Sequence, residues 1–117
     1  MISLPIIVDY RRDGDVFLAI SEEVATRSVE AIDVLDGEVY FFDANGYVLT
    51  AQLDGKRRIE RFVATDENAA ETVETRLRQC LYRLDRAHGV EKVRDYSMTP
   101  LRGLIELLGG TEMAFKR

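Results

Sequence analysis

A tight-turn signal inside one apolar segment constrains this fold more than any other feature of the sequence. Residues 38–64 hold two apolar runs, and Asn45-Gly46 stands between them. A two-residue type I′ turn needs a positive φ at both central residues, and asparagine and glycine tolerate that conformation best. The sequence therefore predicts a β-hairpin centred on Asn45-Gly46, against which the rest of the chain packs.

The length of the turn decides which hairpin side chains share a face. With a two-residue loop, one face is apolar, and we expect it to meet the core with Tyr40, Phe42, Tyr47, Leu49, Ala51 and Leu53. The other face includes Val39 and Phe41, which are either covered by another segment or free as a contact site. A second turn at Asp54-Gly55 leads into a further strand. A three-residue loop there places Ile59 opposite Ala51, whereas a two-residue loop places a charged side chain there at a cost of about 2–5 kcal/mol.

Three more strands are predicted before the hairpin, at residues 4–10, 15–20 and 29–35. Pro5 lies near the start of the first strand and suggests an edge position. A two-residue turn at Asp13-Gly14 would pair Val8 with Ala19. Ser21 can cap a single helical turn between the second and third strands. Because the loops are short, we expect five to six antiparallel strands.

The apolar spacing changes to a helical period after residue 65. Between Asp66 and His88, apolar residues recur every three or four positions, which predicts an amphipathic helix lying across one face of the sheet. Thr65 or Asp66 can cap its beginning, and Gly89 can end it. The arrangement predicts an α+β protein with one long helix in the second half of the chain.

A second, shorter helix is predicted near the C-terminus. Thr99-Pro100 is typical of a helix start, with Thr99 as the cap and Pro100 as the first helical residue, and Gly109-Gly110 is typical of a helix end. Residues 90–96 fit either a short strand or a loop, and residues 111–117 are expected to fray. The sequence contains no linker or repeat, so we predict a single α+β domain over residues 1–117.

The composition favours an ordered cytoplasmic protein. Of 117 residues, 46% are apolar and 32% are charged, which is enough apolar material for a core. No apolar run approaches the roughly 18 residues of a membrane span, and the first residues lack the basic region of a signal peptide. Cys80 is the single cysteine, so no internal disulfide is expected and a reducing cytosol fits.

Charge is distributed unevenly along the chain. The net charge is −5, but residues 1–55 hold three basic residues against eleven acidic ones, and residues 56–117 hold thirteen against ten. An acidic surface repels membranes and nucleic acids and attracts basic partners, although such charges also serve solubility alone. We therefore expect a basic protein partner, no membrane contact, and no nucleic-acid partner.

Few side chains offer chemistry. His88 is the only histidine and suits a helix end, while Cys80 falls on the apolar helix face, where burial makes a thiol inert. Acidic turns such as Asp13-Gly14 could act in acid–base catalysis or bind divalent cations, but turns favour aspartate and glycine for their own geometry. We predict no catalytic residue, no metal site and no cofactor.

One basic run stands out, made of Lys56, Arg57 and Arg58 with Arg61 nearby. These side chains could contact phosphate groups, or they could be the solvated tip of a hairpin. The acidic chain and the absence of tryptophan favour the solvated tip.

Residues 29–49, with the sequence VEAIDVLDGEVYFFDANGYVL, resemble a segment of small bacterial proteins. Some of these are immunity proteins of contact-dependent growth inhibition and related polymorphic toxin systems. The resemblance implies a cytosolic, acidic α+β protein that binds one toxin domain and blocks it. Such proteins share no motif of functional residues, so the resemblance transfers no site to this chain.

Together these features lead us to expect a non-enzymatic binding protein, an immunity protein that occludes the active site of a basic, nuclease-type toxin. The expected partner-binding residues are acidic, with two apolar anchors: Asp9, Asp13, Asp15, Glu22, Glu23, Asp33, Asp36, Glu38, Val39 and Phe41. Three alternatives stay open. They are an antitoxin-like or regulatory module that contacts nucleic acid through Lys56–Arg61, an enzyme that uses the acidic turns with a divalent ion, and a homodimer formed through the second hairpin face.

Overall fold

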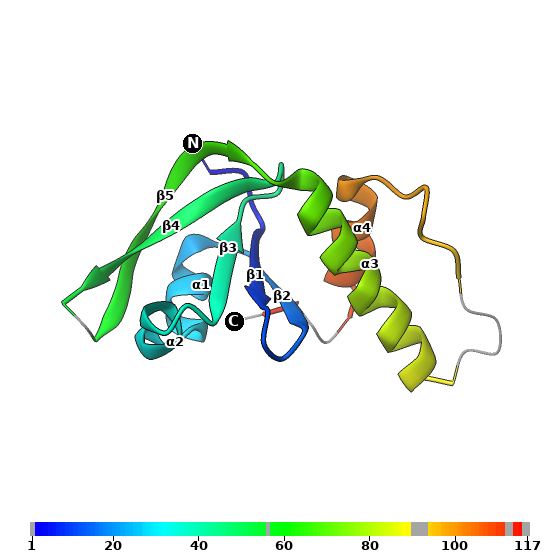
Figure 1. The fold of residues 1–117 in the computed structure, drawn as a ribbon, viewed down its shortest axis with the longest axis horizontal. Coiled ribbons are helices and arrows are strands. Elements are labelled where there is room, and N and C mark those ends of the chain that lie inside the picture. Colours follow the sequence, from blue (N-terminus) through cyan, green and yellow to red (C-terminus); the bar gives the residue numbers. More distant parts are fainter. Residues whose placement is uncertain (1, 56, 90–93, 112–113, 116–117) are drawn as a thin grey trace.

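The protein folds around one six-stranded sheet with the strand order β5-β4-β3-β1-β2-β6 (Figure 1). This computed structural model describes residues 2–55, 57–89, 94–111 and 114–115. The strands are β1 Ile6–Tyr10, β2 Asp15–Ala19, β3 Val39–Phe42, β4 Tyr47–Asp54, β5 Arg58–Asn68 and β6 Ala114–Phe115. The helices are α1 Glu22–Ser28, α2 Ala31–Leu35, α3 Ala70–Ala87 and α4 Leu101–Gly109. Each pair of neighbouring strands among β5, β4, β3, β1 and β2 runs antiparallel, and β6 pairs with β2 in parallel. This sheet with its helices confirms the predicted α+β class.

β1 lies between β3 and β2, and its alternating side chains enter two separate cores. Ile7 packs in a cluster with residues of α3 and α4, while Ile6 and Val8 pack in a cluster with residues of α1 and the β4–β5 hairpin. Figure 1 shows the two helix pairs on opposite sides of this strand. The prediction that this strand lies at an edge of the sheet is therefore wrong. Pro5 precedes β1 and takes no part in its pairing with the neighbouring strands.

The β1–β2 hairpin keeps the predicted faces but has a longer loop. Val8 lies opposite Phe17 where the short loop predicted Ala19, and Tyr10 lies opposite Asp15. The register therefore moves by two residues, and a shift of two leaves every side chain on its face. Gly14 closes the loop with a φ of 74° and donates its N–H to the Tyr10 carbonyl at 2.9 Å.

The β3–β4 hairpin differs from the prediction by one residue, so the side chains of β3 change face relative to those of β4. Phe42 lies opposite Val48 and Phe41 opposite Leu49. The cause is Asp43, whose Oδ1 accepts the backbone N–H of Asn45 at 2.9 Å and of Tyr47 at 3.0 Å. Of the two predicted turn residues only Gly46 has a positive φ, so the type I′ turn does not form.

The exchange decides which hairpin side chains are buried. Val39 and Phe41, on the face that the prediction left open, are buried beneath α1 and α2 in the same cluster as Leu49. Tyr40 and Tyr47, predicted to lie in the core, are 42% and 38% exposed.

The β4–β5 hairpin is longer than predicted. Ile59 is buried as expected, but it lies opposite Leu53 and not opposite Ala51. β5 continues to Asn68, with irregularities of register near both ends, so Thr65 belongs to a strand and does not cap a helix. The Thr65 hydroxyl instead donates to the Val48 carbonyl at 2.7 Å.

The predicted third strand, residues 29–35, is wrong. The segment holds Val29, which is the C-cap residue of α1, and the short helix α2, in which Ala31 and Val34 contact the core. A spacing of three places both residues on one helical face, which a strand cannot do. The predicted Ser21 cap is confirmed, because its Oγ accepts the Val24 N–H at 3.1 Å.

α3 and α4 match the predicted helices, apart from the residues at which they start. α3 begins at Ala70, where the Asn68 Oδ1 accepts the Ala70 N–H at 3.0 Å, and Gly89 follows its end with a φ of 68°. α4 begins at Leu101 with Pro100 as its N-cap residue, one position later than predicted, so Thr99 is not its cap. No helix among the described residues is long and apolar enough to cross a membrane.

Two predicted segments lie partly outside the described residues. Residues 90–93 are outside them, and residues 94–96 form no strand. In the tail, Ala114 and Phe115 pair with Leu18 and Ala19, so the prediction of fraying is wrong for these two residues. Residues 112–113 and 116–117 also lie outside the described part.

Candidate protein-binding surface

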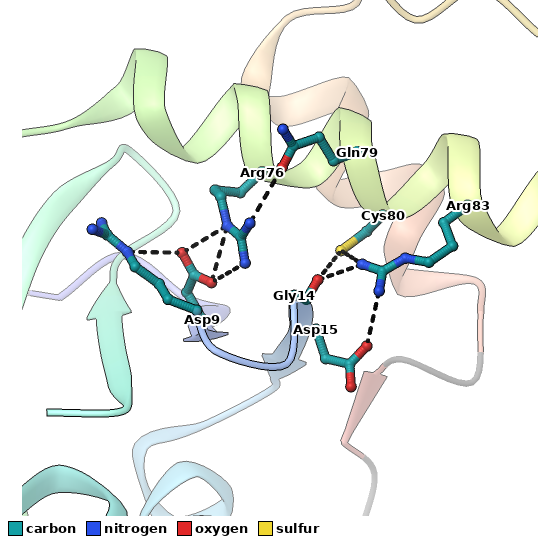
Figure 2. A network of polar contacts seen from close by, with 8 residues as sticks. Asp9, Gly14, Asp15, Arg76, Gln79, Cys80 and Arg83 are labelled. Atoms are coloured by element: carbon teal, nitrogen blue, oxygen red, sulfur yellow. Dashed lines mark hydrogen bonds and ion pairs between the residues drawn. The ribbon is translucent and has the colours of Figure 1, made fainter. Parts of the chain in front are cut away.

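Asp9, one of the predicted contact residues, is a buried part of the scaffold. Its side chain is 1% exposed and lies on the face of β1 that meets α3. The Arg76 guanidinium donates from Nη2 to Oδ1 at 2.8 Å and from Nε to both carboxylate oxygens at 3.2 Å (Figure 2). Arg11 approaches the same carboxylate at 3.6 Å. The expectation that Asp9 is available to a partner is therefore wrong.

Asp15 and its neighbour Gly14 also contact α3. The Arg83 Nη1 lies 3.6 Å from the Asp15 carboxylate, and its Nη2 donates to the Gly14 carbonyl (Figure 2). Cys80 lies beside them and is buried, and burial raises the pKa of its thiol. This network fixes α3 to the β1–β2 loop and presents no reactive group.

A third predicted carboxylate, Glu38, is paired with an arginine of the same loop. Arg12 Nη1 lies 2.7 Å from Glu38 Oε1. The preceding residue, Arg11, stacks over the Tyr40 ring with its guanidinium carbon 4.1 Å from the ring centroid. Both contacts are at the surface, so they screen part of the local negative charge without removing it.

Three carboxylates lie near enough to the phenol of Tyr10 for their charges to act on it. Burial raises the pKa of Tyr10, and the negative charges of Asp33, Glu30 and Asp13 raise it further. The three acids come from two segments, because Asp13 lies in the β1–β2 loop, while Glu30 is the N-cap residue of α2 and Asp33 lies within that helix. None of them forms an ion pair with the described residues, but Glu30 lines a hollow together with Arg27, Arg57 and Arg58, so positive charge lies beside it.

Apolar side chains lie beside these acids on α2. Ile32 is 55% exposed and Leu35 is 50% exposed, one helical turn apart on a helix that also carries Asp33. We call the set Asp13, Glu30, Ile32, Asp33 and Leu35 the Tyr10 surface. It combines an exposed apolar pair with three acids, a composition that suits a protein contact.

The remaining predicted carboxylates lie elsewhere. Glu22 and Glu23 occupy the first turn of α1, where negative charge suits the helix end, and Asp36 is exposed just after α2. The predicted anchors Val39 and Phe41 are 6% and 3% exposed, so their expected role as surface contacts is wrong. Glu30 was missed because the strand prediction for residues 29–35 concealed the start of a helix.

The basic run is largely engaged within its own hairpin. Arg61 Nε donates to Gln52 Oε1 at 2.6 Å, and Arg58 Nε lies 3.6 Å from the Asp54 carboxylate. Arg57 is exposed, and Lys56 lies outside the described residues. These contacts are those expected of a solvated hairpin tip.

A buried polar network that the sequence did not reveal joins the end of α3 to the segment before α4. Asp85, 3% exposed, accepts hydrogen bonds from Arg94 and, at 2.7 Å, from the Tyr96 hydroxyl. The bonds from Arg94 and Tyr96 hold the pKa of Asp85 below its usual range. Burial, together with the bond to Asp85, raises the pKa of Tyr96 to about 12. Since each member is satisfied, the network is structural.

The described residues hold no group of three histidine, cysteine, aspartate or glutamate side chains that could bind a metal ion. The acids around Tyr10 thus do not converge as metal ligands do. Comparison with known proteins adds no assignment: no family model, curated protein or solved structure matches this chain.

Proposed function

We propose that this chain is a non-enzymatic binding protein that docks a basic protein partner on the Tyr10 surface. The observation that supports the proposal best is the composition of α2, where the acids Glu30 and Asp33 accompany an exposed apolar pair, with the charge of Asp13 nearby at the Tyr10 phenol. The exposed pair Ile32 and Leu35 supplies apolar area beside them. Apolar contacts of this kind provide affinity, and the acids provide orientation and a fast encounter.

The resemblance of residues 29–49 to immunity proteins adds a physiological role to this proposal. The segment includes α2, and therefore most of the Tyr10 surface. In that role the protein acts in the cytoplasm and neutralises a nuclease-type toxin domain. It does so by covering the cationic site with which such a toxin binds its substrate. The mechanism is occlusion, so it requires no catalytic residue or cofactor of the inhibitor.

The proposal is tested with the basic protein encoded beside this gene. We expect it to bind, and we expect the affinity measured by calorimetry to fall steeply as salt rises. Replacing both Glu30 and Asp33 with lysine should abolish binding and protection of cells from the toxin. Glu71→Lys is the matched control, because Glu71 is an exposed acid on α3.

Two results would contradict the proposal. One is binding that does not depend on salt, and the other is equal loss of binding in the Glu71→Lys control.

A third variant, Ile32→Ser with Leu35→Ser, removes only the apolar pair. It should weaken binding while leaving its salt dependence unchanged.

A further inference from the structure

A hollow of about 520 Å³ lies between the α1–α2 segment and the tip of the β4–β5 hairpin (Figure 1). Its lining comes from two segments far apart in the sequence, residues 26–32 and residues 57–58. Three arginines contribute to it, namely Arg27, Arg57 and Arg58. A guanidinium is planar and donates two parallel hydrogen bonds to the oxygens of a phosphate group, so arginines suit the binding of phosphates.

Two of these guanidiniums have no acidic partner. Arg27 lies in the last turn of α1 and Arg57 in the β4–β5 turn, and neither side chain forms an ion pair or a hydrogen bond with the described residues. Arg58 differs, because its Nε lies 3.6 Å from the Asp54 carboxylate. The hollow therefore brings together two unpaired positive charges from separate segments of a chain whose net charge is −5.

The hollow also has an apolar lining that is fixed in place. Val29 and Ala31 line it and are 4% and 5% exposed. Val29 packs in the same buried cluster as Ile59, the residue after Arg58, so the end of α1 and the hairpin are held against each other. A cleft with charges of one sign and low-dielectric walls concentrates the electric field and attracts ions of the opposite sign.

We infer that this hollow binds a small phosphate monoester, with Arg27 and Arg57 as the contacts of the phosphate group. Such a group carries about 1.5–2 negative charges at neutral pH, which matches two unpaired guanidiniums. Ile32 lines the same hollow and is 55% exposed, so it offers apolar contact to the organic part of the ligand. The inference does not depend on the proposed function, because neither arginine belongs to the Tyr10 surface.

A titration with phenyl phosphate, followed by nuclear magnetic resonance at low salt, tests the site. We expect saturable shifts of the backbone amide signals of residues 26–32 and 57–58, with a dissociation constant of about 1 mM for a ligand of this size. Arg27→Gln and Arg57→Gln should each weaken binding about fivefold, as expected for the loss of one exposed charge contact. The variant with both substitutions should show no saturation. Circular dichroism confirms that each variant is folded.

Two further variants separate a defined site from general attraction between charges. Arg86→Gln is the matched control, because Arg86 is an exposed arginine in the last turn of α3. Glu30 lines the hollow and repels an anion, so Glu30→Gln should tighten binding about two- to threefold. Equal weakening in Arg86→Gln, or amide shifts spread over arginines throughout the molecule, would overturn the inference.

Two further ligands test the chemical class. Benzoate keeps an aromatic ring but has a single negative charge, and inorganic phosphate keeps the charge but has no organic part. Each should bind about fivefold more weakly than phenyl phosphate, because each lacks one of the two kinds of contact. Equal affinity for benzoate would show that the hollow takes carboxylates as well, including an acidic side chain of another protein. Equal affinity for inorganic phosphate would show that the apolar lining adds nothing. Either result contradicts the assignment to a phosphate monoester.

Discussion

At the scale of single residues, Asp9 shows how one buried charge ties a helix to the sheet. Its carboxylate is 1% exposed, and Arg76 binds both oxygens. Asp9→Ala leaves the guanidinium, itself only 20% exposed, without its partner. We expect the free energy of unfolding to fall by about 3–5 kcal/mol.

Urea denaturation measures this loss, and Asp15→Ala provides the comparison. Asp15 and Arg83 are 43% and 46% exposed and lie 3.6 Å apart, so breaking that pair should cost less than about 1 kcal/mol. Equal losses of unfolding free energy in the two variants would show that the buried Asp9–Arg76 pair contributes no more than the exposed Asp15–Arg83 pair.

Tyr96 gives the stability a defined dependence on alkaline pH. Its pKa is raised from 10.0 to about 12 in the folded protein, so the folded state retains the phenol proton longer than the unfolded chain does. The corresponding stability is complete below pH 10 and is lost as the pH rises from 10 towards 12. We expect the difference in unfolding free energy between the wild type and Tyr96→Phe to shrink across this window. Urea denaturation at each pH measures this difference. If the difference stays constant across the window, deprotonation of the Tyr96 phenol does not cause the loss of stability.

At the scale of elements, the β3–β4 turn fits tightly against the start of α3. Gly46 has a φ of 88°, its carbonyl accepts the Ala69 N–H at 2.8 Å, and a Cβ built on it would lie 2.6 Å from Ala70 Cα. Gly46→Ala therefore combines backbone strain with a clash against backbone atoms. Gly37→Ala has strain alone, because nothing lies within 4 Å of its added Cβ.

Thermal or urea unfolding of these two variants tests the fit. Gly37→Ala should cost about 1–2 kcal/mol, and Gly46→Ala should cost clearly more. The additional loss should be accompanied by faster amide exchange in the first turn of α3. Equal costs would mean that the turn can move away from α3 freely.

The same turn explains which elements could be predicted from the sequence. Helix boundaries set by local residues, such as Pro100 and Gly89, were predictable because capping acts within a few positions. The faces of β3 and β4 were not, because the Asp43 carboxylate replaced the expected turn with a longer one. A single additional loop residue reverses the faces of one strand relative to the other.

At the scale of the whole molecule, the sequence indicated an acidic first half but not where the acids lie. Asp9, Asp15 and Glu38 are paired with arginines, and those pairings depend on helix and loop positions far apart in the chain. The acids that remain near Tyr10 are brought together by α2, which was predicted as a strand. The candidate surface therefore depends on tertiary structure that local patterns do not encode.

The central position of β1 has one more consequence. Ile7 and Val8 are adjacent in the sequence, yet each belongs to a different hydrophobic cluster on its own side of the sheet. Methyl groups at these two positions would therefore act as independent spectroscopic probes. A molecule that loosened on one side only would change one signal and leave the other as it was.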